Sequence, residues 1–481
     1  MIYPGFCGSY ASSQSRIANA EDLVNWYVQT LTVNSKAEKA LYPTPGVVDW
    51  CQLPGTPARG IFLDPTGRIF AIAGGTPCEI TDNGSSGAAV AVGGVMVQDA
   101  NPPTIDSNGD GGGQLFIVSG NKGYILDVAT LVLTEVVTNV LIGAFLDTFF
   151  LALDPASSTL KISDSNNGLT WDPTQFAQRS SASDRWASMI VGPGGGEVYL
   201  FGTATTDIWF NKGTAPFPLA PVQSAKIKYG TGAPFSVGWI GNGPIWLAQN
   251  KNGARTVQKL RGYDPVKVST EPIDTFLAGL PTVADAENVV YEEEGHEFYA
   301  LNFPTANKSI VWDDTEGEWH RAGVWNSLAT DYDVWHPRCH AYVNNKHLVG
   351  DRATGMIHRM SNTFGLDAGG RPLRRLRQAA GLQRERKRLF FSALELYLEV
   401  GLGVATGQGS DPQVMLRTSG DGGKTFGSIR SRSAGRRGKY NKRVRWNNLS
   451  AVRDRVDQIV VSDPIPWRIL GAFLEPRGSS I

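Results

Sequence analysis

The chain has 481 residues, and its 45 basic and 45 acidic side chains give a formal net charge of zero. This length exceeds one ordinary compact domain and indicates two or three domains, unless a repeat lets one domain grow. The four cysteines, Cys7, Cys51, Cys78 and Cys339, form no CxxC pair, which excludes a disulfide-stapled small fold and predicts reduced thiols in a protein made in a cytoplasm. Neither an export signal nor an apolar run of about 20 residues is visible, so we expect no membrane span.

The charges are unevenly placed along the chain. From Arg371 onward there are 22 Lys and Arg residues against 9 Asp and Glu, whereas residues 1–370 have 23 against 36. The C-terminal part is therefore a basic module beside an acidic remainder.

A hairpin pattern recurs from about residue 60 to about residue 360. Each copy has a short run of alternating aromatic and aliphatic residues, a turn with Gly or Asn, and a second run. Clear copies begin at residues 67, 113, 196, 243 and 297, and the spacing is mostly about 45 residues, which is the length of a four-stranded propeller blade. We predict an all-β fold with a β-propeller of six or seven blades; stacked sandwiches are the alternative, but they predict no repeat of blade length.

The pattern breaks after residue 370, and strict alternation over residues 392–400 then predicts a half-buried strand. We therefore divide the chain into an N-terminal arm or platform segment (1–60), the β-propeller (61–370) and a basic C-terminal β domain (371–481). Packing of the C-terminal domain with the N-terminal segment into one platform is an arrangement that these ranges allow.

Two stretches resemble the Asp-box, S-x-D-x-G-x-T-[WF]. Residues 419–426 match without a mismatch, and residues 164–171 are a looser copy. We interpret both as structural turns, in which Asp or Asn bonds backbone amides, Gly adopts positive φ and the aromatic ring packs beneath the hairpin. The predicted turn residues are Ser419, Asp421, Gly423, Thr425, Phe426, Asn166, Gly168, Thr170 and Trp171.

Basic runs in the C-terminal part predict contact with DNA phosphates or with an acidic protein surface, and the sequence leaves both open. Alternation would place Arg443 and Arg445 on one face of a strand and Val444 on the other. The candidate contacts are Arg374, Arg375, Arg377, Arg386, Lys387, Arg388, Arg436, Arg437, Lys442, Arg443 and Arg445.

No stretch predicts a catalytic residue, a cofactor site or a metal site. His336, Cys339 and His340 lie within five residues, but no second ligand pair accompanies them, so we interpret them as strand-end residues. The acidic run at residues 292–294 beside His296 is interpreted as a solvated turn. Asp-boxes also occur in sialidases, but an arginine cluster, a tyrosine nucleophile and an acid cannot be singled out here.

Several segments, taken in order, resemble the tail-nozzle proteins of short-tailed bacteriophages, also called packaged-DNA stabilisation proteins or tail accessory factors. The resemblance includes residues 19–27, 41–46 and 58–60 near the N-terminus, residues 201–213 and 260–273 in the propeller, and residues 419–430 and 441–455 in the C-terminal domain.

This resemblance implies a structural virion protein of the tail, made in the bacterial host cytoplasm. It further implies a ring of six copies below the head-to-tail adaptor, with the C-terminal domain and the N-terminal segment as the platform that docks on that adaptor. A tail needle, fibre or plug would close the ring. The ring would retain packaged double-stranded DNA and conduct it during ejection without reading its sequence. Two alternatives stay open at this point: an Asp-box glycosidase or glycan-binding propeller, and a cellular propeller scaffold.

Overall fold

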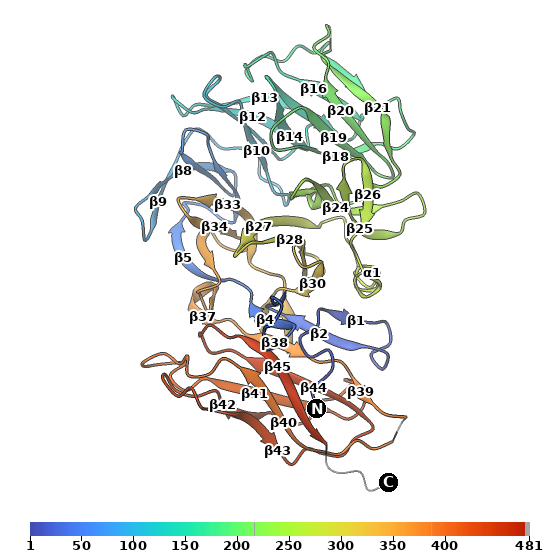
Figure 1. Ribbon diagram of the computed structural model, residues 1–481. Helices are drawn as coiled ribbons and strands as arrows, with labels where there is room; N and C mark the ends of the chain where they lie inside the picture. The colour runs from blue at the N-terminus through green and yellow to red at the C-terminus, as the bar shows by residue number, and fades with distance from the viewer. Residues whose placement is uncertain (216, 386, 477–481) are drawn as a thin grey trace.

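A computed structural model describes residues 1–215, 217–385 and 387–476. Seven antiparallel units, six with four strands and one with five, follow one another around a ring, and a β-sandwich of the first and last strands of the chain lies at the other end of the molecule (Figure 1). The predicted all-β architecture, a propeller with a small additional β domain, is confirmed, and the blade number is seven. No helix in the described part of the chain has the length and apolarity to cross a membrane.

The first four blades consist of consecutive strands. Blade 1 has β6 (Ala58–Leu63), β7 (Ile69–Ala73), β8 (Thr76–Asp82) and β9 (Gly87–Ala91). Blade 2 has β10 (Thr104–Ser107), β11 (Gln114–Ser119), β12 (Lys122–Asp127) and β13 (Leu133–Thr138). Blade 3 has β14 (Ile142–Leu146), β15 (Phe149–Asp154), β16 (Thr159–Ile162) and β17 (Phe176–Gln178), and blade 4 has β18 (Trp186–Val191), β19 (Glu197–Gly202), β20 (Thr206–Asn211) and β21 (Leu219–Ile227).

Blades 5 and 6 are also consecutive. Blade 5 has the short strands β22 (Gly230–Thr231) and β23 (Gly238–Ile240), which both pair with β24 (Gly243–Gln249), then β25 (Arg255–Arg261) and β26 (Asp264–Lys267). Helix α1 (Glu271–Ala278) leads to blade 6, which has β27 (Glu287–Glu293), β28 (His296–Phe303), β29 (Lys308–Asp313) and β30 (Glu318–Arg321). The hairpin of β31 (Val324–Asn326) and β32 (Asp331–Asp333) follows.

Strand order explains why these sequences form blades. The second strand of a blade, such as β11, is buried on both faces because it packs against both neighbouring blades, so it is a continuous apolar run rather than an alternating one. Tight turns join the strands, and Gly120 and Asn121 in the β11–β12 turn both have positive φ, a conformation that these two residue types adopt most easily.

The ring closes through a strand from the N-terminal part of the chain. Blade 7 has β33 (Pro337–Val343), β34 (Lys346–Asp351) and β35 (Met356–Ser361), and its outer strand is β5 (Gly46–Gln52), which pairs with β35. Residues 46–52 lie within the predicted N-terminal arm or platform segment (1–60), so this part of that segment belongs to the propeller instead. Pairing across about 300 residues leaves no local pattern in the sequence, so this closing strand could not be predicted.

The sandwich combines both ends of the chain. One sheet has β2 (Ala20–Val24), β38 (Arg375–Gln378), β44 (Asp454–Val461), β41 (Gln413–Ser419) and β42 (Arg430–Ser433), with β1 (Ala11–Ser12) and β39 (Leu382–Gln383) beside it. The other has β3 (Trp26–Thr30), β4 (Lys39–Pro43), β45 (Ile469–Pro476), β40 (Phe391–Leu398) and β43 (Val444–Asn447). Two further short strands, β36 (Leu366–Asp367) and β37 (Arg371–Pro372), connect blade 7 to the sandwich.

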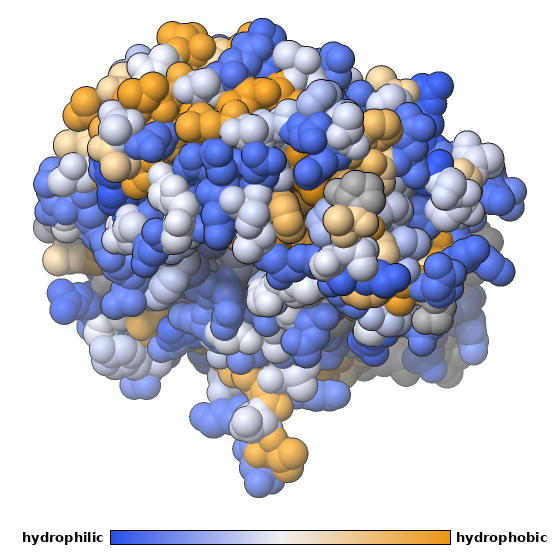
Figure 2. Space-filling model, turned by 90° about the horizontal axis from the view of Figure 1, so that it is seen from above, coloured by the Kyte–Doolittle hydropathy of each residue, from blue (hydrophilic) through white to orange (hydrophobic). Residues whose placement is uncertain are grey.

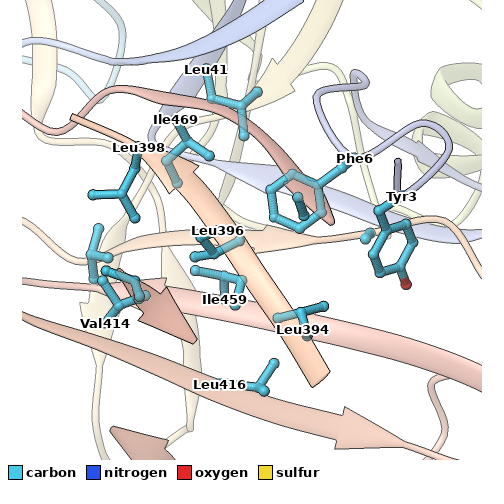
Figure 3. Close-up of a cluster of buried hydrophobic side chains, with 14 of the residues drawn as sticks. Tyr3, Phe6, Leu41, Leu394, Leu396, Leu398, Val414, Leu416, Ile459 and Ile469 are labelled. Carbon is cyan, nitrogen blue, oxygen red and sulfur yellow. The ribbon is translucent and has the colours of Figure 1, made fainter. Parts of the chain in front are cut away.

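A single apolar core fills the space between the two sheets. Figure 3 shows side chains from both chain ends meeting there, with Phe6 and Leu41 packed near Leu396 and Ile469. Without the N-terminal residues this core would be open on one side, so the sandwich depends on about 40 residues that precede the propeller.

Asn25 joins the propeller to the sandwich. It is buried, has φ 59° and lies between β2 and β3. Its amide nitrogen donates to the carbonyls of Gly323 (2.9 Å) and Arg374 (2.8 Å), and its side-chain oxygen accepts from the Gly323 amide (3.0 Å). In addition, β30 of blade 6 pairs in parallel with β2, so one sheet runs from the propeller into the sandwich.

Candidate assembly surfaces

Two of the predicted partner contacts on β38 lie inside the protein. Arg375 and Arg377 are at most 1% exposed. Arg377 donates to the carbonyls of Phe6 and Gly5 (2.7 Å each) and to Glu21 (2.7 Å), and burial lowers the pKa of Arg375 to about 10. The expectation that these two arginines contact a partner or DNA is therefore corrected: they donate hydrogen bonds to backbone carbonyls inside the protein.

Arg374 is half-buried and also has an internal contact. Its guanidinium lies 4.0 Å from the ring centroid of Trp325 in the β31–β32 hairpin, a cation–π arrangement. It thereby connects β38 to the segment that leaves blade 6, rather than extending into solvent.

Arg443 and Arg445 extend outward at strand β43, while Val444 and Trp446 are buried on the other face. Both arginines are paired with carboxylates, Arg443 with Glu395 (Nε to Oε1 2.7 Å) and Arg445 with Glu475 (2.5 and 2.6 Å). Their charge is thus largely neutralised within the same sheet.

The loop of residues 435–442 carries a group of four basic side chains without an ion pair in the described part of the chain. Arg436, Arg437, Lys439 and Lys442 are exposed and form no ion pair with any described residue. The loop borders a cavity of about 650 Å³. Tyr440 and Asn441 of the loop line this cavity, and Asp411 lines it from outside the loop. Of the predicted contacts, Arg436, Arg437 and Lys442 in this loop therefore stay available to an acidic partner surface.

The predicted contacts near residue 386 are only partly described. Lys387 is exposed and pairs with Glu385 at 2.9 Å, and Arg388 is exposed. Arg386 lies outside the described residues.

The first Asp-box turn connects β41 to β42 in the sandwich, not two strands of a blade. Asp421 accepts from the amides of Lys424 (3.0 Å) and Thr425 (2.9 Å) and from the Thr425 hydroxyl (2.6 Å), and Ser419 accepts from the Gly423 amide (2.9 Å). The hydrogen bonds from Ser419 and Thr425 hold the pKa of Asp421 well below its usual range. Gly423 has φ 86°, and half-buried Phe426 lies beneath the Arg417 guanidinium.

The second stretch is a different turn, which corrects our expectation for it. Asn166, not Gly168, has positive φ (52°), and the amide-capping side chain is Asn167, whose oxygen accepts from Leu169 (3.0 Å). Gly168 is needed for close packing instead, because a Cβ there would lie 2.3 Å from Ile125. Trp171 donates to the Gly168 carbonyl (2.7 Å), and Thr170 accepts from the Asn167 amide group (3.1 Å).

The inner strands of the blades surround an axial cavity of about 360 Å³. Its wall includes buried Arg59 of β6 and Arg338 of β33, which pair with Asp99 and with Glu287 (2.7 Å), respectively. Asp106 of β10 also lines it, and burial raises the pKa of Asp106 to about 6 although the amides of Phe145 and Ser107 lower it. No residue of either Asp-box stretch lies in this wall.

These wall arginines were not predicted. The available signal was a single arginine at the start of an apolar strand, as in residues 58–63. Such a charge on an inner strand indicates a buried acidic partner.

The motifs interpreted as strand ends and turns have internal partners. His296 bonds Asp313 (2.8 Å), His340 bonds His347 (3.0 Å), and His336 lies 3.5 Å from Asp351. Among the residues that the structure describes, no group of three or more His, Cys, Asp or Glu side chains is arranged to hold a metal ion.

Comparison with protein families gives two matches in the same order as the domains. The family described as "Bacteriophage P22 Gp10, beta-propeller" matches residues 22–365, and "Bacteriophage P22 Gp10, beta-sandwich" matches residues 374–472. The chain belongs to the P22 Gp10 family. Members of this family are tail accessory or nozzle-type proteins of short-tailed phages, so the chain is a structural component of a phage tail.

The two family matches divide the chain as the strands do, with one exception. The propeller match begins at residue 22 and so includes β3 and β4, which the structure places in the sandwich. The sandwich match covers β40 to β44 completely and ends within β45.

Comparison with curated protein sequences gives no match. Similar solved structures include the N-terminal domain of Nup159 (11% identity, 66% of this chain and 95% of that one, TM-score 0.39) and YCF48 from Cyanidioschyzon merolae (12%, 66% and 98%, 0.41). A mitotic checkpoint complex chain is also similar (11%, 69% and 96%, 0.38). With TM-scores below 0.5 these likenesses carry no argument about function.

Proposed function

We propose that this chain is the subunit of a ring-shaped tail nozzle. Six copies would form a ring below the head-to-tail adaptor, retain the packaged DNA and later conduct it into the host. The observation that carries this proposal is the family match, which includes both the propeller and the sandwich in order. The subunit would act as wall material, without catalysis, and be made in the cytoplasm of the bacterial host before it joins the virion.

The way the two domains are joined supports a wall function. The propeller and the sandwich share one sheet through β30 and β2, and Asn25 bonds both. A subunit with this connection transmits load between its ends instead of bending at a linker, as a conduit under the pressure of packaged DNA requires.

Charge supports an orientation of the subunit. The unpaired cations of loop 435–442 lie on the sandwich, whereas residues 1–370 have 13 more acidic than basic side chains. We propose that the sandwich docks on the adaptor and that acidic propellers surround the lumen, where they repel double-stranded DNA and let it slide without sequence readout. A needle, fibre or plug would close the propeller end.

Negative-stain microscopy and mass measurement of the purified chain, alone and with the adaptor ring of the same phage, test this proposal. We expect a ring of about six copies with an axial channel that binds the adaptor. A chain that stays monomeric and ignores the adaptor would contradict it and favour the glycosidase or glycan-binding alternative, which a hydrolysis screen and a glycan array then address.

Charge reversal tests the orientation separately. The triple variant Arg436→Glu, Arg437→Glu, Lys439→Glu should lose adaptor binding, and the matched propeller variant Lys212→Glu, Lys228→Glu, Lys251→Glu should keep it, because both sets are exposed and carry no ion pair with described residues. Equal binding by both variants would refute docking through the sandwich loop.

A further inference from the structure

The axial cavity differs in character from the outer surface of the molecule. On the outer face that Figure 2 shows, hydrophilic residues cover much of the surface. Most residues that line the cavity of about 360 Å³ are instead apolar, among them Ile61, Phe62, Pro103, Ile105, Met189 and Phe235. Because the wall has few polar groups, those groups decide what the cavity can bind. The hydroxyl, amide, carboxyl and guanidinium side chains of the wall belong to Arg59, Thr104, Asp106, Ser188, Asn288 and Arg338.

Four of these side chains are already engaged with the neighbouring blade. They form hydrogen bonds of 2.7 to 2.9 Å with its backbone amides or carbonyls, and they are Thr104, Asp106, Ser188 and Asn288. Arg59 is engaged as well. Its Nη1 donates to the Gly74 carbonyl (3.0 Å) and to Ser119 (2.8 Å), its Nη2 to Asp99, and its Nε to the Asn101 carbonyl (3.2 Å).

Arg338 is the wall residue that has more donors than partners. Its Nη2 donates to Glu287 (2.7 Å) and to the Ala100 carbonyl. The Nε is buried and has no hydrogen-bond partner, and Nη1 donates to no described residue. The residue is 8% exposed, and a buried donor without an acceptor costs free energy. Arg338 therefore has N–H groups left for an acceptor in the cavity.

Positive charge is in excess around Arg338. Glu287 binds both Arg338 (2.7 Å) and Arg352 (2.9 Å), and Asp99 binds Arg59. Within the described residues, these two carboxylates are the only ones at ion-pair distance from the three guanidinium groups. Burial lowers the pKa of Arg59 and of Arg352, and the positive charge of Arg338 lowers both further. An anion beside Arg338 would balance this charge.

We infer that the axial cavity binds a small monovalent carboxylate with an apolar body. The carboxylate accepts hydrogen bonds from the N–H groups of Arg338 that Glu287 and Ala100 do not use, in the planar geometry that guanidinium and carboxylate groups share. The apolar body packs against the apolar wall. A divalent phosphate fits less well, because it carries more charge than the excess it would balance and loses more hydration in an apolar cavity.

Such a ligand strengthens the closure of the propeller ring. Arg338 lies on β33 of blade 7 and Arg59 on β6 of blade 1, and these are the first and last blades of the ring. A ligand that binds the folded chain and not the unfolded one stabilises the fold by mass action. This inference goes beyond the proposed nozzle, and neither of the two depends on the other.

Calorimetric titration of the full chain with benzoate, in a buffer without other carboxylates, tests this inference. Benzamide has the same shape without the negative charge, and inorganic phosphate is the competing anion. We expect the wild type to bind benzoate but not benzamide, and phosphate at the same concentration should not displace benzoate. Benzoate should also raise the midpoint of thermal unfolding, whereas benzamide should not.

Two variants locate the ligand. Arg338→Lys retains the positive charge beside Glu287 but loses the spare N–H groups of the guanidinium, so it should bind benzoate at least about tenfold more weakly. Ile105→Trp fills part of the cavity, leaves Arg338 in place and should also lose binding. Arg179→Lys is the matched control, because Arg179 is also buried and ion-paired but does not line the cavity, and it should bind benzoate as the wild type does.

Circular dichroism checks that each variant folds, and if Arg338→Lys does not, Ile105→Trp and the comparison of benzoate with benzamide still decide. A wild type that does not bind benzoate, or that binds benzamide equally well, would overturn the inference. So would a folded Arg338→Lys with the affinity of the wild type, or unchanged binding by Ile105→Trp. Displacement of benzoate by phosphate would overturn the assignment of the ligand as a carboxylate.

Discussion

The propeller and the sandwich are both made of β-strands, but they differ in how far apart along the chain their paired strands lie. Blades 1 to 6 pair consecutive strands, whereas the sandwich pairs β2 with β38 and β4 with β45. Closing such long loops costs more chain entropy, so the sandwich needs strong contacts between chain ends to compensate. Its buried arginines are contacts of this kind.

The strongest test of this difference is Arg377→Met. The side chain is fully buried, joins β38 to residues 5, 6 and 21, and leaves Glu21 without its cation when removed. We expect the free energy of unfolding of the sandwich to fall by about 3–5 kcal/mol, as for other broken buried ion pairs. Hydrogen exchange followed by mass spectrometry should show the loss in β2, β38 and β44 and leave blades 2 to 4 protected.

Arg443→Met is the matched control for that experiment. It removes an arginine of the same domain that is exposed and paired only with Glu395, so the unfolding midpoint should stay nearly unchanged. Equal destabilisation by the two variants would show that the buried contacts between chain ends contribute no more to the free energy of unfolding than an exposed ion pair does.

Asn25→Ala would sharpen the comparison by separating the two regions. The alanine leaves the Gly323 amide and the carbonyls of Gly323 and Arg374 without their partner in a buried place, and it disfavours the positive φ. We expect a loss of about 1–3 kcal/mol. Calorimetry should show the unfolding transitions of propeller and sandwich further apart than in wild type, and a single unchanged transition would contradict the role of Asn25 as the joint.

The same difference decides what could be predicted from the sequence. The propeller repeat and the start of the C-terminal domain were visible because hairpins and alternating strands leave local patterns. Packing of the N-terminal segment with the C-terminal domain was anticipated, but the pairing of β2 with β38, of β4 with β45 and of β5 with β35 was not visible, because these partners lie more than 300 residues apart.

The predicted partner contacts also divide into residues whose surroundings depend on distant parts of the chain and residues whose surroundings are local. The run from Arg374 to Arg377 has the composition of a surface patch, and only the distant carbonyls of Phe6, Gly5 and Thr44 make it an interior one. Loop 435–442 lies in a Gly-rich segment with no nearby acid, which is why its cations could be located from sequence alone. The axial arginines needed the ring itself, since Asp99 and Glu287 come from other blades or loops.

The propeller should respond more to acid than the sandwich does. His320 of blade 6 is buried, and burial, followed by the charge of His296, lowers its pKa to about 3. In the unfolded chain His320 takes up a proton near pH 6.5, whereas in the folded chain it stays neutral. The contribution of neutral His320 to the free energy of unfolding is therefore complete above about pH 7. It falls by about 1.4 kcal/mol per pH unit as the pH drops below 6.5. Thermal unfolding between pH 8 and 5 should show a smaller slope for His320→Phe than for wild type, and parallel curves would contradict this source of acid sensitivity.

The smallest expected effect separates the two turns that look alike in sequence. Asp421 bonds two amides and a hydroxyl within its own turn, whereas the Asn166 side chain has no hydrogen-bond partner among the described residues. Asp421→Ala should therefore speed amide exchange at Lys424 and Thr425, and wild type should lose the same protection as the pH falls below about 4, because the pKa of Asp421 is depressed only in the folded turn. Asn166→Gly keeps the positive φ and should leave exchange in residues 164–171 unchanged. Faster exchange in that variant would mean that the Asn166 side chain holds the turn, as in an Asp-box. The packing of Gly168 against blade 2 would then not be what orders this turn.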